Sequence, residues 1–399
     1  MQELIYDGPT TMKQEEEMPA VRLFQELLLK GYETGASDIH LEPMETILQV
    51  RMRIDGVLKC HCRLEKSIYL PLMTCAKIRS GMDIAEKRLP QDGHCRIMVS
   101  GTELNLRAGT MPTIYGEKMV LRYLNRNTAV DRIDTFGMDT FHYEKMSALL
   151  KRPGGIIYFT GPTGSGKTTT LYMILEKMAE EAKNIMTIED PVEKMIPGII
   201  QSQINNQSGL TFETGLRAIL RQDPDVIMIG ETRDSQTAKI AVRAAIAGNL
   251  VLSTLHTRNA AAAVSRMIDL GVEPYLAAEC LNGVVSQRLA KKVCTACAED
   301  VPVSEAERKI LGIKRKTVRQ GKGCPVCNGT GYKGRIAVHE ILAVDRHMRR
   351  MIAEKKSSEE LFEYARTAQN MCSLRENMVH LVELGITTID EVLRLTDAE

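Results

Sequence analysis

The residues of this chain with the clearest chemical role form the run from Gly161 to Thr168. They read Gly-Pro-Thr-Gly-Ser-Gly-Lys-Thr and fit the pattern G-x-x-x-x-G-K-[ST] of a phosphate-binding loop. Glycines let backbone N–H groups curl around phosphate oxygens, and a helix N-terminus behind the loop adds partial positive charge. Lys167 would reach the β- and γ-phosphates, and Thr168 would hold Mg²⁺. The predicted nucleotide-binding residues are Gly161, Pro162, Thr163, Gly164, Ser165, Gly166, Lys167, Thr168 and Thr169.

The elements that such a loop requires stand on both sides of it. Residues 155–160 read as a short buried strand, and residues 169–179 show the helical spacing of apolar side chains. Strand, loop and helix in this order form the context in which the motif is specific. We therefore expect the chain to bind a nucleoside triphosphate.

Two further apolar strands end in acidic residues that could serve phosphate chemistry. One is 184–189, which ends at Glu189, and the other is 225–231, which ends at Glu231. Because Gly230 stands where many such strands carry a metal-binding aspartate, Glu231 is expected on the Mg²⁺ side, directly or through water. Glu189 is then the better candidate for polarising the attacking water. The sequence leaves open that these two roles are exchanged.

A histidine follows another buried strand, at 250–255. Most single histidines in such positions are structural. His256, however, ends a strand of the same expected sheet, near the edge at which ligands bind in α/β proteins. It is therefore predicted to sense the γ-phosphate.

Two cysteine pairs have the spacing of a metal site. The pattern C-x₂-C…C-x₂-C suits four thiolates around a structural Zn²⁺ ion with no open position. A zinc ribbon that binds nucleic acid is the other functional interpretation. The predicted ligands are Cys294, Cys297, Cys324 and Cys327. Cys60-His-Cys62, the other close spacing, is expected to be structural.

Composition narrows the classes of protein. A chain of 399 residues is long enough for two or three domains. The formal net charge of +1 and the absence of Trp argue against a dedicated nucleic-acid binder and against stacking platforms for single strands. The sequence shows neither a long apolar run nor a signal-peptide pattern, so a cytoplasmic protein with reduced cysteines is expected.

Strands alternate with helices from about residue 132 to 290, which is typical of a parallel sheet with crossover helices. The N-terminal part instead reads as a small α+β domain. The predicted organisation is a flexible arm at 1–18, this domain at 19–126, a linker at 127–131, and an α/β domain at 132–399 that includes a cysteine-rich insert at 291–333 and a helical C-terminal part.

Taken together, these motifs resemble the secretion ATPase superfamily that powers type II secretion and type IV pilus assembly. The similarity covers nearly the whole chain. In the N-terminal part it rests on the segments 35–43, 53–56, 88–93, 106–107, 112–117 and 121–122. In the α/β domain it rests on the phosphate loop and on the segments 187–193, 216–225, 230–231 and 253–257.

The resemblance implies a RecA-like P-loop NTPase core, a smaller PAS-like N-terminal domain and a hexameric ring. It also implies that Arg107 and Arg122 reach the nucleotide phosphates. The expected function is ATP hydrolysis that drives assembly of a type IV pilus or a type II pseudopilus. The motor would work at the cytoplasmic face of the membrane, bound peripherally to an inner-membrane platform protein, without a nucleic-acid partner. The expected cofactors are ATP, Mg²⁺ and Zn²⁺.

Alternatives and departures from the family pattern remain. A retraction or DNA-transfer motor of the same superfamily is one alternative, and the cysteine insert weighs against retraction. A zinc-ribbon nucleic-acid binder and a nucleotide-binding scaffold without turnover are the others. Asn249 stands where the family usually has histidine, and Arg258 replaces a small or polar residue. The chain also resembles a short form that lacks an additional N-terminal docking module.

Overall fold

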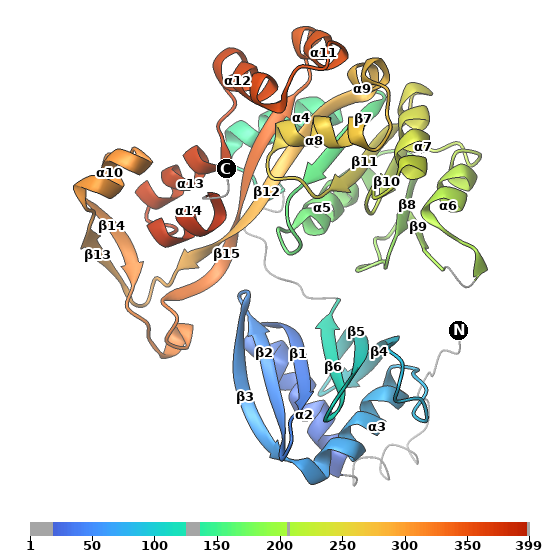
Figure 1. Ribbon diagram of the computed structural model, residues 1–399, viewed down its shortest axis with the longest axis vertical. Coiled ribbons are helices and arrows are strands. Elements are labelled where there is room, and N and C mark those ends of the chain that lie inside the picture. The colour runs from blue at the N-terminus through green and yellow to red at the C-terminus, as the bar shows by residue number, and fades with distance from the viewer. Residues whose placement is uncertain (1–18, 125–135, 206–207, 397–399) are drawn as a thin grey trace. The chain divides into compact units, whose positions relative to one another are not determined.

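The computed structural model of this chain describes residues 19–124, 136–205 and 208–396 (Figure 1). The predicted arm at 1–18 and the predicted linker at 127–131 lie outside the described residues. The chain divides into two compact units, Met1–Thr128 and Ala129–Glu399, which are described separately below.

The N-terminal unit is built on a six-stranded antiparallel sheet with the order β3-β2-β1-β6-β5-β4. On β1 the side chains alternate. Ile39 and Leu41 pack with Phe24 and Leu72 of the helices into one core, whereas the polar side chains at 38, 40 and 42 lie on the opposite face. The elements are α2 (Pro19–Thr34), β1 (Ala36–Pro43), β2 (Ile47–Ile54), β3 (Val57–Glu65), α3 (Tyr69–Arg79), β4 (Gln91–Val99), β5 (Thr102–Thr113) and β6 (Gly116–Tyr123).

Strand β3 lies at the edge of this sheet. Its sequence, Val-Leu-Lys-Cys-His-Cys-Arg-Leu-Glu, leaves most side chains at least partly exposed. An edge strand needs few apolar residues, so its periodicity is weak. The turn before it has Asp55 and Gly56 both at positive φ.

The second unit contains a seven-stranded sheet with the order β15-β12-β7-β11-β10-β8-β9. Neighbouring strands are parallel except for the antiparallel pair β12 and β15. The strands are β7 (Gly155–Thr160), β8 (Ile185–Glu189), β9 (Ile200–Gln203), β10 (Val226–Ile229), β11 (Leu250–Leu255), β12 (Leu281–Val293) and β15 (Tyr332–Ala343). The predicted α/β class with a parallel sheet is confirmed.

Helices cover both faces of this sheet, and the central strands are therefore apolar throughout. On β10, Ile227 and Ile229 join the core beneath α6, α7, α8 and α9, whereas Val226 and Met228 join the core beneath α4 and α5. These helices are α4 (Thr140–Leu150), α5 (Lys167–Ala179), α6 (Phe212–Ile219), α7 (Ser235–Ile246), α8 (Ala260–Asp269) and α9 (Pro274–Cys280).

The cysteine-rich insert leaves the sheet between β12 and β15. It holds a two-stranded antiparallel sheet and a short helix, and its Val303 and Val318 share a core with Met378 and Val382 of the C-terminal helices. The remaining elements are β13 (Ala298–Pro302), α10 (Glu305–Leu311), β14 (Thr317–Gly321), α11 (Arg346–Ala353), α12 (Ser358–Gln369), α13 (Leu374–Glu383) and α14 (Ile389–Thr396). Among the described residues, no helix has the length and apolar character needed to cross a membrane.

Candidate active site

The phosphate loop leaves β7 and enters α5, as the sequence predicts. Gly161 and Gly166 adopt φ angles of +146° and +88°, which favour glycine. A Cβ atom at Gly161 would lie 2.4 Å from the carbonyl oxygen of Gln287 on β12. The loop therefore needs glycine both for its curvature and for its close approach to the neighbouring strand.

Lys167 lies at the first position of α5 and is buried, with 8% of its surface exposed. Its Nζ donates to the carbonyl oxygens of Gly161 at 2.7 Å and Pro162 at 3.2 Å. Burial, assisted by the charge of Arg288, lowers the pKa of Lys167 to about 8, while Glu231 acts in the opposite direction. The ammonium group is thus mostly charged at neutral pH, as contact with a phosphate oxygen requires.

Glu231 and His256 lie together near this lysine. They follow β10 and β11, which are adjacent parallel strands, and His256 Nε2 lies 3.8 Å from Glu231 Oε2. Arg233 forms an ion pair with the same glutamate. Burial and then the charge of Lys167 lower the pKa of His256 below its ordinary value, so the imidazole is neutral at neutral pH.

The loop that carries His256 is tied to the strand that enters the phosphate loop. The backbone N–H of Thr257 donates to Thr160 Oγ1 at 2.8 Å, and the two threonine hydroxyls lie 2.7 Å apart. The structure therefore brings together three predicted site residues from separate segments: Lys167, Glu231 and His256.

Glu189 ends β8 but points into a different environment. Only 2% of its surface is exposed. Its Oε1 accepts hydrogen bonds from Thr187 Oγ1 at 2.6 Å and Gln201 Nε2 at 3.2 Å, and its Oε2 accepts one from the hydroxyl of Tyr172 on α5. Both carboxylate oxygens are thus engaged within the fold.

Arg107 and Arg122 belong to the N-terminal unit, where they are direct partners in the register of β5 and β6. Opposite residues in an antiparallel pair share one face of the sheet. Arg107 Nη2 donates to Asp92 Oδ1 at 3.2 Å, and Arg122 Nε donates to the buried Asp38 at 2.7 Å. Their predicted contact with nucleotide remains a prediction.

The four predicted zinc ligands form one cluster. Their sulfur atoms all lie within 4.8 Å of one another, and the separations Cys294–Cys324, Cys297–Cys327 and Cys324–Cys327 are 3.9, 3.8 and 3.8 Å. Zn–S bonds of about 2.3 Å in a tetrahedron place the sulfurs about 3.8 Å apart. The four thiols therefore have the chemistry and the spacing for Zn²⁺.

Sequence reasoning missed Gln287 and Arg288 on β12. Both are buried beside the phosphate loop, and Gln287 Nε2 donates to the carbonyl oxygen of Ser165 at 2.9 Å. The available signal was a run of three polar residues, Ser286 to Arg288, between apolar pairs at 284–285 and 289–290.

The two departures from the family pattern occupy different places. Asn249 precedes β11, so it lies at the amino end of the sheet's strands, opposite the loops with Lys167 and His256, and its side chain donates to the carbonyl oxygen of Pro224. Arg258 lies in the His256 loop, where its backbone oxygen accepts a hydrogen bond from Arg288.

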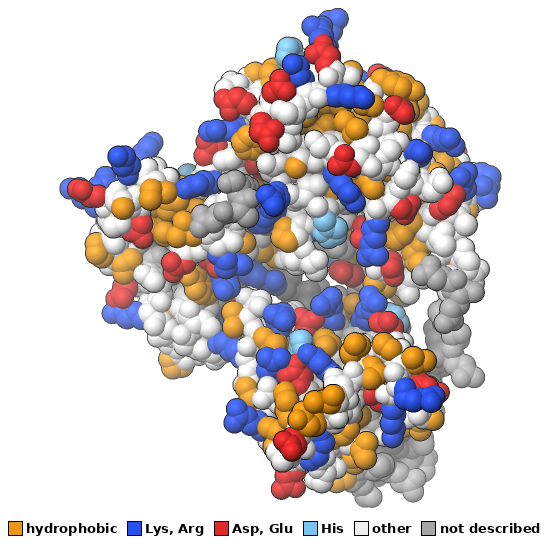
Figure 2. Space-filling view, viewed as in Figure 1, with side chains coloured by type: hydrophobic (Ala, Val, Ile, Leu, Met, Phe, Trp, Pro, Cys, Tyr) orange, Lys and Arg blue, Asp and Glu red, His pale blue; other side chains and the backbone are white. Residues whose placement is uncertain are grey.

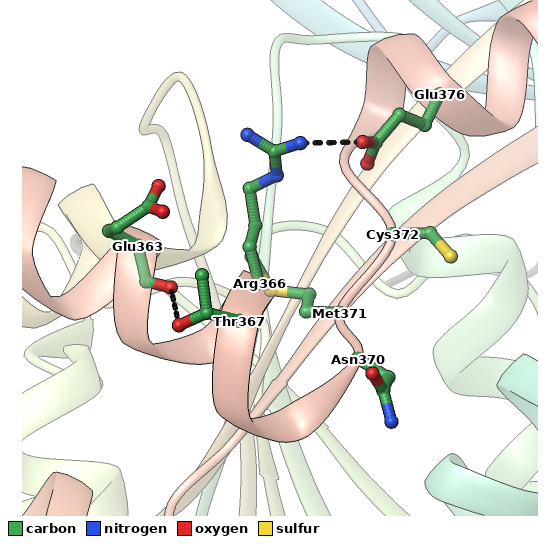
Figure 3. Close-up of a pocket in the computed structure, with 7 residues that line it drawn as sticks. All are labelled: Glu363, Arg366, Thr367, Asn370, Met371, Cys372 and Glu376. Atoms are coloured by element: carbon green, nitrogen blue, oxygen red, sulfur yellow. Dashed lines mark hydrogen bonds and ion pairs between the residues drawn. The ribbon is translucent and has the colours of Figure 1, made fainter.

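One further cavity has none of the predicted site residues in its lining. This cavity of about 320 Å³ lies between α12 and α13, and Figure 3 shows the side chains that line it. It is crossed by an ion pair of 2.7 Å between Arg366 and Glu376 and has Cys372 in its lining. On the visible face of the molecule, basic and acidic side chains are interspersed (Figure 2), as expected for a net charge of +1.

Comparison with known proteins gives a consistent result. A family model described as "Type II/IV secretion system protein" matches residues 13–394. The type IV pilus assembly ATPase PilB of Thermus thermophilus is 45% identical over 386 residues, which are 96% of this chain and 43% of that protein. The type II secretion system protein E of Pseudomonas aeruginosa is 42% identical over 97% of this chain and 78% of its own length. The chain thus spans less than half of the first relative and about three quarters of the second.

Solved structures show the same fold. The pilus retraction motor PilT with bound ADP is 25% identical, has a TM-score of 0.65, and the match covers 93% of this chain and 96% of PilT. The ATPase DotB of Legionella pneumophila is 20% identical with a TM-score of 0.67, over 94% of this chain and 96% of DotB. The predicted RecA-like P-loop NTPase core with a second, smaller unit is therefore confirmed.

Proposed function

This chain belongs to the type II/IV secretion system protein family, and we propose that it is an ATP hydrolase that drives assembly of a type IV pilus or a type II secretion pseudopilus. The observation that carries the proposal is the convergence of Lys167, Glu231 and His256 at the carboxyl ends of neighbouring strands. Ligands of open α/β sheets bind at this edge. The relative named as the type IV pilus assembly ATPase PilB supports the same reaction class.

The reaction is attack of water on the γ-phosphate. Lys167 would neutralise charge on the β- and γ-phosphates, and Thr168 would hold Mg²⁺. The ion would supply further charge neutralisation on the phosphate oxygens. His256, neutral and half-exposed, would contact the γ-phosphate.

The division of roles between the two acids follows from their surroundings. Both oxygens of Glu189 accept hydrogen bonds from Tyr172, Thr187 and Gln201. Glu231 lies instead beside Lys167 and His256. We therefore propose a third assignment, in which Glu231 orients the attacking water and Glu189 holds the acidic segment after β8 in place.

Assembly is favoured over retraction by the relatives and by the insert. Identity to the assembly ATPase PilB is 45%, against 25% to the retraction motor PilT. The proposed arrangement is a homohexamer at the cytoplasmic face of the membrane, bound to an inner-membrane platform protein. Arg107 and Arg122 would contact the nucleotide phosphates, for which their planar guanidinium groups are suited.

The direct test is ATP hydrolysis by the purified chain beside Lys167→Ala, measured over a range of protein concentrations with mass by light scattering. We expect at least about a 100-fold loss in the variant, because it removes a cation from the charge that develops. The wild-type rate should rise with concentration as rings form. A monomer with a concentration-independent rate would contradict the ring, and equal rates would contradict the site.

A further inference from the structure

We propose that Arg288 is a positioning residue of the nucleotide site, which fixes the loop carrying His256 against the phosphate loop. This inference rests on the proposed ATP hydrolysis. It assigns a role to a residue of β12 that belongs to neither loop. Three structural relationships support it.

The first is the register of the sheet. Strand β12 runs parallel to β7, and Ser286 pairs with Thr160, the last residue before the phosphate loop. The next two residues of β12 are therefore level with the beginning of that loop. Sheet geometry, rather than a flexible connection, sets where Gln287 and Arg288 stand.

The second is the contact between β12 and the phosphate loop. Gln287 Nε2 holds the carbonyl oxygen of Ser165, and a Cβ atom at Gly161 would meet both the Gln287 carbonyl oxygen and Arg288 Nη1, at 2.4 and 3.1 Å. Gln287 Oε1 and Ser165 Oγ are buried there and have no hydrogen-bond partner in the described part of the chain. The phosphate loop thus lies directly on these two residues of β12.

The third is the contact between Arg288 and the His256 loop. Arg288 Nη2 donates to the carbonyl oxygen of Arg258 at 2.5 Å, and Nη1 donates to the carbonyl oxygen of the neighbouring Gln287 at 3.1 Å. Arg258 follows His256 by two residues. One buried guanidinium group therefore reaches from the edge of the phosphate loop to the His256 loop. Its planar arrangement of N–H groups lets it donate to both carbonyl oxygens at once.

This arrangement predicts a specific defect when the fork is lost. The phosphate loop keeps its own contacts through Lys167 and Gln287, so nucleotide should still bind. The His256 loop would lose one of its supports. Small displacements of a catalytic group can cost about 100-fold in rate, so turnover should fall more than affinity.

The test uses the full chain with Arg288→Gln and Arg288→Lys, each alone and combined with His256→Ala. Lysine keeps the charge but cannot hold two carbonyls in a fixed plane. We expect both Arg288 variants to lower kcat for MgATP about 10- to 100-fold, with less than about a threefold change in the Kd of a fluorescent ADP analogue. Each double variant should be no slower than His256→Ala alone, because Arg288 acts through that loop.

A matched control is Arg152, which follows α4 and contacts the backbone at the other end of β12. Arg152 Nη1 also donates to backbone carbonyl oxygens, those of Asn282 and Val344, at 3.3 Å each. Arg152→Gln should lower the melting temperature without the change in kcat. If Arg152→Gln lowers kcat to the same extent, Arg288 acts only on stability and the inference is wrong. If the effects of Arg288→Gln and His256→Ala multiply, Arg288 does not act through the His256 loop and the inference is also wrong. A loss of ADP affinity above about tenfold would instead indicate direct phosphate contact.

Hydrogen exchange of the nucleotide-free protein separates this inference from the proposed function. We expect faster exchange of the peptide that covers Thr257 in both Arg288 variants, but not in Arg152→Gln. This readout is valid even if the wild type fails to hydrolyse ATP. Unchanged exchange in that peptide would overturn the inference whatever the activity.

Discussion

The imidazole Nε2 of His256 lies 3.8 Å from Oε2 of Glu231, at the ends of two adjacent parallel strands. The pair is close because β10 and β11 end at the same edge of the sheet, where Lys167 also contributes its charge. Burial and this neighbouring cation keep the imidazole neutral. A neutral histidine beside a carboxylate suits contact with phosphate and water without binding the carboxylate as a fixed ion pair.

The two acids should therefore respond differently to removal of their charge. Glu231→Gln is expected to retain ATP binding and to lose at least about 100-fold in kcat, because an amide cannot take a proton from water. Glu189→Gln should lose less, since its neighbours Tyr172, Thr187 and Gln201 still surround the site. Steady-state kinetics and nucleotide titration decide this. A slow Glu189→Gln beside a normal Glu231→Gln would restore the original assignment of the two roles.

The N-terminal arginines give a second prediction. Arg122 Nε donates to the buried Asp38, and Ser37 Oγ donates to the same carboxylate at 2.7 Å. Sixty per cent of the Arg122 side chain is exposed. The carboxylate thus orients the guanidinium while much of it faces outward. Arg122→Lys and Asp38→Asn should both reduce ATP turnover while largely sparing ADP affinity.

Glu42 is the matched control, because it is a second buried carboxylate on the same strand. Although burial opposes it, hydrogen bonds from Arg51 and Lys118 lower the pKa of Glu42 to about 2. Glu42→Gln should lower the melting temperature of the N-terminal unit, since breaking a buried ion pair costs about 3–5 kcal/mol. Turnover at temperatures below melting should be less affected than in Asp38→Asn. Equal loss in both variants would show that Asp38 acts only through stability.

The sequence alone predicted those parts of the site that depend on neighbouring residues in the chain. Gly161 to Thr168 carry their own conformational requirement, and the apolar strands at 155–160 and 250–255 reveal that both sheet faces are covered. The cysteine pairs could be recognised from the sequence in the same way, because zinc sites in loops have characteristic local spacing.

Contacts between distant segments could not be predicted in this way. Tyr172 meets Glu189 across 17 positions, and Arg288 meets Arg258 across 30. No periodicity marks a side chain that will face a neighbouring strand or helix. This is why the sequence could not distinguish the role of Glu189 from that of Glu231. It is also why the sequence did not place Gln287 and Arg288 beside the phosphate loop.

Acid should destabilise the second unit through His339. Burial lowers the pKa of this histidine to about 3, whereas an unfolded histidine has a pKa near 6.5. Between these values the unfolded chain binds the extra proton, so the associated stability is present above pH 6.5 and is lost as the pH falls. The slope for one such group is about 1.4 kcal/mol per pH unit.

Denaturant unfolding between pH 7 and 5 checks this prediction. His339→Leu places an apolar side chain of similar size in the buried site and removes the titrating group. Its stability should depend less on pH than that of the wild type, whatever the difference at pH 7. Parallel curves for the two proteins would show that folding does not lower the pKa of His339.

Removal of zinc is the last prediction. The four sulfurs join the connection after β12 to the connection before β15, and the backbone N–H of Cys294 donates to Gly331 at 2.9 Å. One Zn²⁺ per chain is expected by elemental analysis, and Cys294→Ser with Cys324→Ser should abolish it. Because metal binding contributes directly to folding, its loss should lower the melting temperature of the protein. ADP affinity should change little, since the cysteines lie outside the phosphate and His256 loops.

Cys60→Ser with Cys62→Ser, which removes two cysteines outside the cluster, should keep both the metal and the melting temperature. Wild-type protein without metal that melts at the same temperature as the zinc-loaded protein would rule out a structural zinc site.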